Sequence, residues 1–257
     1  MQTDFRRLIS EFLSSAIEDY CRQKNQPPLW KAPLIKYASA DDELFERLPE
    51  LIPGHHLPFD FLPGAKTVIS YFLPFVDEIG AGNIDGMLCS EEWAFAYNFT
   101  NTMAVWLNEG LAGYLRSLGY DAAVPTDALL DPDTLMSRWS QRHVGYIAGQ
   151  GTFGLNNMLI SDVGCVGRYF SIVTALPIEP DRRPEPEKNR ADERCLYKRE
   201  GGCMLCVSRC PAGALSRDGF DREKCAANCG ENGKQRSAKV CGKCLVGLPC
   251  SSYNIPR

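Results

Sequence analysis

The sequence predicts an α/β (α+β) protein whose last third is a separate cysteine-rich domain. Apolar segments with helical spacing alternate with short β-branched runs up to about residue 180, which is typical of a mixed fold. A charged, proline-rich stretch at 179–194 is typical of a linker. Nine of the twelve cysteines fall in the 56 residues from Cys195 to Cys250. We therefore expect one domain over residues 1–180 and a second over 181–257.

The first domain should begin with an amphipathic helix over residues 3–24. Its apolar residues recur with helical spacing, and the Pro27-Pro28 pair that follows cannot continue a helix. Residues 65–73 are β-branched and apolar between turn residues, so they predict a buried strand. A long helix is expected over 91–118, ending near Gly119.

The second half of this domain should contain shorter elements. We expect a short strand at 120–125 and a helix over 134–148. Residues 157–161 and 168–176 have the composition of strands, and the short connection between them predicts a hairpin.

The cysteine spacing carries the strongest chemical signal. It reads Cys195-x7-Cys203-x2-Cys206-x3-Cys210-Pro211, then Cys225, then Cys241-x2-Cys244-x5-Cys250. Closely spaced thiolates wrap one 4Fe–4S cluster, while a cysteine followed by proline ligates the neighbouring cluster in two-cluster ferredoxins. This pattern predicts two clusters. The first would take Cys195, Cys203, Cys206 and Cys250, and the second Cys210, Cys225, Cys241 and Cys244. Cys229 is left over, and Cys21, Cys89 and Cys165 are expected to have no cluster role.

Cysteines in this number could also form disulfides or bind zinc. A disulfide framework is disfavoured because the chain has no secretory segment and is long enough to bury a core. Zinc is the stronger rival, since tetrathiolate zinc sites also use paired C-x2-C units. The first group here is instead a triplet closed by Cys210-Pro211, which favours iron–sulfur clusters.

Composition narrows the class of protein. No apolar run approaches the roughly 20 residues that a membrane helix requires. The Arg6-Arg7 pair is followed by polar and acidic residues rather than by the apolar segment of an export signal. Many free thiols indicate a reducing compartment, so we expect a cytoplasmic protein without a membrane partner.

Charge is distributed unevenly along the chain. Residues 1–180 hold 12 Lys and Arg against 22 Asp and Glu, whereas residues 181–257 hold 16 against 10. A basic C-terminal part could bind nucleic acid. It could equally offset the negative charge of thiolate-bound clusters, which is the simpler explanation.

A glycine-rich loop at residues 149–154 (GQGTFG) matches the G-x-G-x-x-G pattern of dinucleotide sites. The pattern requires a preceding strand and a following helix, and the predicted elements here stand in the opposite order. A nicotinamide site is therefore disfavoured. Two hypotheses remain: a backbone that approaches a large flat ligand, and a close-packed turn without a ligand.

The run RHVGYIAGQGTFGLNNMLIS, the later GRYFSIVTALPI and the eight-cysteine pattern resemble epoxyqueuosine reductases. That family is related in turn to the reductive dehalogenases. The resemblance covers about residues 63–257 and is strongest in the cysteine region. It implies a nitroreductase-like core that binds cobalamin, followed by a bacterial two-cluster ferredoxin domain that passes electrons to the cobalt.

Carried over by position, the resemblance implies a set of site residues. The corrin would lie against Gly149, Gly151, Gly154, Asn156, Leu159, Ser161 and Tyr169. Asp127 is the nearest match to the family's proton donor, and His143 beside the loop is a further catalytic candidate. The implied partners are a low-potential donor such as ferredoxin or flavodoxin and a small-molecule or modified-nucleoside substrate, with tRNA as an alternative.

The chain also departs from the family. Thr152 and Leu155 stand where epoxyqueuosine reductases have Trp and Lys, and the sequence ends seven residues after Cys250. We therefore expect a shortened relative: an iron–sulfur oxidoreductase that delivers electrons to cobalamin. Two alternatives remain, a non-catalytic electron carrier or corrinoid-protein reactivator, and a flavin-dependent reductase.

Overall fold

The computed structural model describes residues 3–126 and 131–252. The chain forms two compact units, each made of three separate segments. Unit 1 contains Met1–Leu73, Thr102–Gln150 and Tyr169–Arg183. Unit 2 contains Pro74–Asn101, Gly151–Arg168 and Pro184–Arg257. The cysteine-rich segment from Pro184 onward thus shares a unit with two segments from the first two thirds of the sequence.

Unit 1 is built on a four-stranded sheet in the order β1-β2-β6-β3. Its strands are β1 (Leu34–Ser39), β2 (Thr67–Pro74), β6 (Gly167–Thr174) and β3 (Ala122–Ala123). The β1–β2 pair is antiparallel, with Leu34 opposite Phe72 and Ser39 opposite Thr67. Every residue of β2 is buried, in agreement with a composition that is apolar apart from Thr67 and Ser70.

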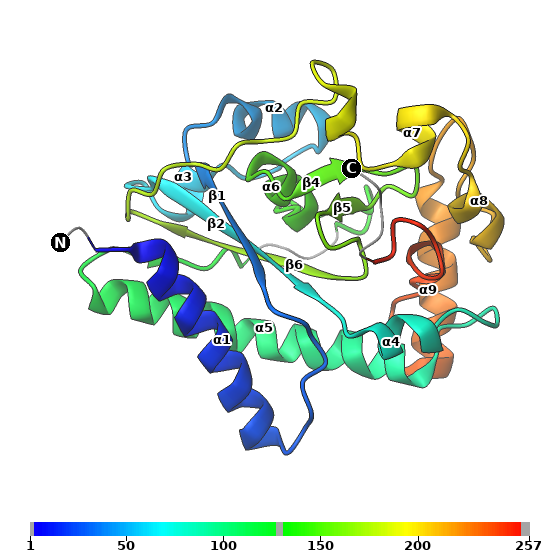
Figure 1. Ribbon diagram of the computed structural model, residues 1–257, viewed down its shortest axis with the longest axis horizontal. Coiled ribbons are helices and arrows are strands. Elements are labelled where there is room, and N and C mark those ends of the chain that lie inside the picture. The colour runs from blue at the N-terminus through cyan, green and yellow to red at the C-terminus, as the bar shows by residue number, and fades with distance from the viewer. Residues whose placement is uncertain (1–2, 127–130, 253–257) are drawn as a thin grey trace. The chain divides into compact units, whose positions relative to one another are not determined.

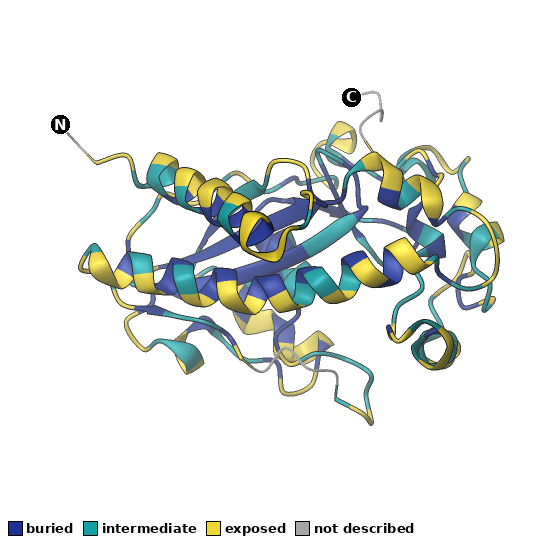
Figure 2. Ribbon diagram, turned by 90° about the horizontal axis from the view of Figure 1, so that it is seen from below, coloured by how far each residue is buried: buried dark blue, intermediate teal, exposed yellow. Residues whose placement is uncertain are grey.

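Two long helices cover one face of this sheet, α1 (Phe5–Lys24) and α5 (Glu91–Ser117) (Figures 1 and 2). Asp4 caps the first turn of α1, and Asn25 ends the helix in a left-handed conformation. Aromatic rings hold the two helices together: Phe12 stacks on Tyr114 with centroids 4.9 Å apart.

The opposite face carries α2 (Glu43–Leu51), α3 (Pro58–Phe61) and α6 (Gln141–Ile147) (Figure 1). Trp139 fills the space beneath them and is fully buried. Its ring lies 5.1 Å from Phe61 and 6.1 Å from Phe45, and its indole N–H donates to Ser171 Oγ on the sheet. A bulky aromatic core therefore joins these helices to the strands.

Unit 2 contains shorter elements. It has a two-stranded ribbon, β4 (Gly151–Phe153) and β5 (Leu159–Ser161), and a helix α4 (Asp77–Gly82). The cysteine-rich segment adds α7 (Leu196–Glu200), α8 (Leu205–Arg209), α9 (Arg222–Arg236) and the 3₁₀ turns η1 (Arg190–Asp192) and η2 (Lys243–Leu245). Most of these elements are a single turn or two long, so tertiary contacts must fix the backbone around the cysteines.

The expected helices and strands at 3–24, 65–73, 91–118 and 120–125 are confirmed as α1, β2, α5 and β3. The predicted hairpin of 157–161 with 168–176 is wrong. β5 pairs with β4, and β6 lies between β2 and β3 in the sheet. The Ser161 hydroxyl donates to the Gly164 carbonyl at 2.7 Å, and this tight turn directs the chain out of the ribbon.

The predicted helix over 134–148 is too long. Leu135 has a φ of 53°, a left-handed conformation that interrupts a right-handed helix, and α6 begins only at Gln141. Strand β1 was not expected, because its sequence LIKYAS has no clear alternation. Among the described residues, no helix is long and apolar enough to cross a membrane.

Candidate functional site

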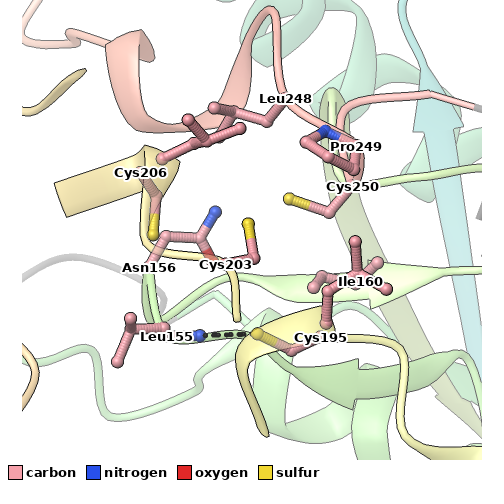
Figure 3. Close-up of a pocket in the computed structure, with 11 residues that line it drawn as sticks. Leu155, Asn156, Ile160, Cys195, Cys203, Cys206, Leu248, Pro249 and Cys250 are labelled. Atoms are coloured by element: carbon pink, nitrogen blue, oxygen red, sulfur yellow. Dashed lines mark hydrogen bonds between the residues drawn. The ribbon is translucent and has the colours of Figure 1, made fainter. Parts of the chain in front are cut away.

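Four of the predicted cluster ligands line one pocket in unit 2 (Figure 3). Cys195, Cys203, Cys206 and Cys250 direct their thiols into a common space. They come from sequence positions up to 55 residues apart. The remaining walls are mostly apolar and are formed by Leu155, Asn156, Ile160, Leu196, Leu205, Leu248 and Pro249.

Cys195 is separated by seven residues from Cys203, the next predicted ligand of the first cluster. Hydrogen bonds nevertheless fix its position. Its backbone N–H donates to Glu193 Oε1 at 2.9 Å, and the same oxygen accepts from the Thr152 hydroxyl at 2.9 Å. Its Sγ accepts from the N–H of Leu155 at 3.5 Å. Glu193 is buried, so this carboxylate serves the protein interior rather than solvent. The long gap before Cys203 therefore does not leave Cys195 loosely placed.

The pKa of Cys206 depends on the other three thiols of this pocket. Burial raises the pKa of Cys206 to about 11, and the neighbouring thiols of Cys250, Cys195 and Cys203 contribute to this rise in that order. The three neighbours that act on Cys206 are its three predicted partners.

A second group of thiols surrounds Cys244. Burial raises the pKa of Cys244, followed by the neighbouring thiols of Cys241, Cys225 and Cys210 and, last, by Cys206. Cys210 Sγ accepts from the N–H of Ala214 at 3.3 Å. The first three neighbours complete the predicted second ligand set. Cys206, from the first set, has the smallest effect.

Cys229, the cysteine left over by the spacing, lies beside the second group. It stands one turn after Cys225 on α9, and its side chain hydrogen-bonds to Cys225. That hydrogen bond is the largest cause of its raised pKa, ahead of burial. Cys225 and Cys229 therefore lie on the same face of α9, and both thiols lie beside the second group.

Across the described residues, no three His, Cys, Asp or Glu side chains converge tightly enough to hold one metal ion. The thiols of the first group instead come from separate segments and face one common pocket, as Figure 3 shows. An arrangement of this kind suits a multi-atom cluster bound by one thiolate per iron.

Several residues around the thiols belong to no sequence motif, so their place beside the thiols was not predicted. Lys243 lies between Cys241 and Cys244, is 2 % exposed, and donates from Nζ to the carbonyls of Asn83 at 3.0 Å and Asp85 at 2.5 Å. The Asn83 amide in turn donates to the Cys241 carbonyl at 3.0 Å. The one feature of the sequence that could have indicated this role is the position of Lys243 between Cys241 and Cys244, two predicted cluster ligands.

The glycines of the 149–154 loop are explained by the protein's own packing. A Cβ on Gly151 would lie 1.8 Å from the carbonyl oxygen of Ile160, its neighbour across the ribbon. A Cβ on Gly149 would lie 2.7 Å from the Arg182 carbonyl, and one on Gly154 would lie 2.6 Å from Asn156 Oδ1. Close packing against the protein's own atoms therefore accounts for the glycine at all three positions, and contact with a ligand stays a prediction.

The other residues predicted to contact a corrin also have internal partners. Asn156 donates to the Cys244 carbonyl at 2.9 Å, and Ser161 closes the turn to Gly164. Leu159 is fully buried, and Tyr169 stacks on Phe72 with centroids 4.3 Å apart. These contacts give each residue a structural role and leave its cofactor role a prediction.

Of the two catalytic candidates, only His143 lies in the part of the chain that the structure describes. His143 lies on α6 in unit 1, where its Nδ1 is 2.7 Å from the Ser140 hydroxyl at the start of the helix. Asp127 lies outside the described residues. Their catalytic roles stay predictions.

No protein-family model matches the chain. In sequence it is 28% identical over 174 residues to an epoxyqueuosine reductase of Bacillus cereus, a match covering 65% of this chain and 40% of that protein. The chain thus spans about 40% of the length of this curated relative.

Solved structures extend the likeness across nearly the whole fold. Epoxyqueuosine reductase from Streptococcus thermophilus superposes with a TM-score of 0.52 at 18% identity, covering 95% of this chain and 68% of that one. Another epoxyqueuosine reductase, in complex with an epoxyqueuosine-modified tRNA stem loop, has a TM-score of 0.54 at 17% identity, covering 93% and 65%. A reductive dehalogenase described as acting in B12-dependent dehalogenation reaches 0.55 at 16% identity, covering 84% of this chain and 29% of its own. The expected resemblance is therefore confirmed: this mixed α/β chain is similar to the epoxyqueuosine reductases in sequence and fold, with the reductive dehalogenases as more distant structural neighbours.

Proposed function

We propose that this chain is an iron–sulfur oxidoreductase that holds two 4Fe–4S clusters in the ferredoxin-type segment 181–257. The observation that carries the proposal is the pocket of Figure 3, where Cys195, Cys203, Cys206 and Cys250 direct four thiols into one space. Four thiolates are the ligand set of such a cluster. The proposal is supported because the four cysteines that line this pocket are the four that the cysteine spacing predicts as ligands of the first cluster.

The second cluster would be held by Cys210, Cys225, Cys241 and Cys244. Support comes from their mutual electrostatic influence on Cys244 and from the common apolar cluster that Cys210 and Cys244 share with Leu215 and Leu248. Cys206 of the first set lies near enough to Cys244 of the second to raise its pKa, and this proximity favours electron passage between the clusters.

The chain's own groups would set the properties of these centres. Backbone N–H groups of Leu155 and Ala214 donate to Cys195 and Cys210 sulfurs, and such bonds raise a cluster's reduction potential by stabilising the more negative reduced state. The buried ammonium of Lys243 adds a positive charge beside Cys241. Iron–sulfur clusters supply one-electron transfer, and the protein holds and tunes them.

The acceptor of these electrons is the finer part of the proposal. Cobalamin is favoured by the likeness to a B12-dependent reductive dehalogenase, and flavin is the alternative. The loop glycines lend neither cofactor support, because the chain itself fills the space beside them. A modified nucleoside, free or in tRNA, is the favoured substrate class, since one structural neighbour binds a modified tRNA stem loop.

The decisive experiment is anaerobic reconstitution with iron and sulfide, followed by analysis of iron, sulfide, cobalt and flavin. We expect about eight iron and eight sulfide per chain, as two such clusters require. Cys206→Ser and Cys244→Ser should each lose about half of both. Tightly bound zinc without sulfide would overturn the proposal. Uptake of flavin but not cobalamin, measured by absorbance, would reject the corrinoid part and leave the clusters.

A further inference from the structure

A second, open groove lies directly outside the thiol pocket of unit 2. It is lined mainly by residues of α7, α8 and the connection between them. Four residues line both this groove and the thiol pocket: Leu196, Cys203, Leu205 and Pro249. A single layer of side chains, which includes a predicted cluster ligand, therefore separates the pocket from the surface.

The lining of the groove is mostly apolar. Leu205 is 48% exposed, one of few large hydrophobic side chains in the described residues to be so. Met204 and Pro249 extend the apolar surface beside it. An apolar centre with a polar rim is the composition of a protein-binding surface.

Cations flank the groove. Arg217 places its guanidinium 3.9 Å from Met204 Sδ on the lining. Lys198 and Arg199 stand on α7, and Arg190 donates to the backbone carbonyls of both. The one acidic lining residue, Glu200, pairs with Arg199 at 2.7 Å. The rim is thus positively charged.

We propose that this groove docks an acidic, low-potential electron-carrier protein that reduces the first cluster. The inference rests on the proposed function, since it requires the cluster. One electron would leave the reduced carrier and enter the centre held behind Cys203, with no bond broken and no proton moved. Charge complementarity between a basic rim and an acidic partner speeds encounter, which suits a transient complex of small area. The apolar floor favours a protein over RNA, because phosphate contacts need cations rather than leucine and methionine.

The test compares two ways of reducing the reconstituted protein under anaerobic stopped flow. The probes are a pre-reduced acidic two-iron ferredoxin and dithionite, which needs no docking surface. Met204→Glu and Arg217→Glu are the groove variants, since both residues lie at the groove and neither lines the thiol pocket. Met87→Glu, at an exposed methionine of unit 2, and Lys234→Glu on α9 are the matched controls.

We expect both groove variants to slow reduction by ferredoxin about tenfold or more, with Arg217→Glu also weakening the salt dependence of the rate. Iron content and reduction by dithionite should match the parent in all four variants, and the controls should keep the ferredoxin rate. Groove variants that react with ferredoxin as fast as the controls would overturn this inference alone. So would groove variants that lose only binding to a tRNA stem loop, which would assign the rim to nucleic acid. A parent protein that takes up no iron would overturn the proposed function as well, and the iron assay separates that outcome from the others.

Discussion

Cys165 and Cys250 are joined through both backbone and side chain. The Cys165 N–H donates to the Cys250 carbonyl at 3.0 Å, and the two thiols are also hydrogen-bonded. That bond, followed by burial, raises the pKa of Cys165, and the same bond lowers the pKa of Cys250. Cys165 therefore keeps its proton, with the Cys250 sulfur and the Leu245 carbonyl, 4.0 Å from Cys165 Sγ, as its two acceptors. A thiol expected to stand apart from the clusters lies against a predicted ligand.

Replacing Cys165 by Ala should leave the full iron content but lower the reduction potential of one cluster. The variant removes a hydrogen bond to a ligand sulfur, and such bonds favour the reduced cluster. Redox titration followed by electron paramagnetic resonance measures this. Cys250→Ala should lose about half the iron. Full iron in Cys250→Ala, with loss only in the double variant, would instead show that Cys165 can act as a ligand.

The spare thiol on α9 can be tested by a matched pair of variants. Cys229→Ser should keep both clusters, whereas Cys225→Ser should lose about half the iron and sulfide. The sequence spacing assigns the ligand role to Cys225, and the structure places both thiols one turn apart on the same helix face. Iron and sulfide analysis after reconstitution decides between them. The reverse result would move the second ligand set by one helical turn.

Gly151→Ala should prevent stable folding of unit 2, irrespective of any cofactor. The added Cβ would meet the Ile160 carbonyl at 1.8 Å, and neither backbone can yield without breaking the ribbon. The control is Gly230→Ala, where nothing lies within 4 Å and a helical Gly→Ala change should stabilise by about 0.5–1 kcal/mol. Urea unfolding and soluble yield measure both. A folded Gly151→Ala protein of normal stability would contradict the packing explanation.

Lys243→Met should destabilise the protein by about 1–3 kcal/mol, the usual cost of leaving buried acceptors unpaired. The side chain keeps its volume but no longer donates to the carbonyls of Asn83 and Asp85. Lys239→Met on an exposed side chain is the control and should change the free energy of unfolding little. Equal stability of the two variants would mean that water replaces the lost donor.

His55 should make stability pH-dependent on the acidic side. Burial is the main cause of its lowered pKa; its Nδ1 lies against the His56 carbonyl, and its Nε2 accepts from the Ser140 N–H. The unfolded chain binds a proton near the ordinary value of about 6.5, while the folded chain resists it. Stability should therefore be full above that pH and fall as the pH drops from about 6.5 toward the folded pKa. The slope, measured by urea unfolding on either side of that pH, should shrink in His55→Gln but not in His56→Gln.

The sequence alone determined the elements whose signals are local, and it predicted the cluster ligands. The apolar run of β2, the helical spacing of α1 and α5, and the eight cysteines with Cys210-Pro211 are each readable from residues near one another. The fold likeness to epoxyqueuosine reductases followed from such motifs. Local signals of this kind reflect backbone preference and ligand geometry, which do not depend on the rest of the chain.

Tertiary structure alone decided everything that depends on long-range pairing. It paired β4 with β5 in place of the expected hairpin, and it combined residues 74–101 and 151–168 with the cysteine-rich segment in one unit. It placed Glu193, Lys243 and Cys165 beside the thiols, although none belongs to a motif. It also placed the Ile160 carbonyl beside Gly151, a close approach that the glycine pattern alone does not specify. Such contacts depend on burial and on which polar groups need partners once buried, and that requirement exists only in the folded chain.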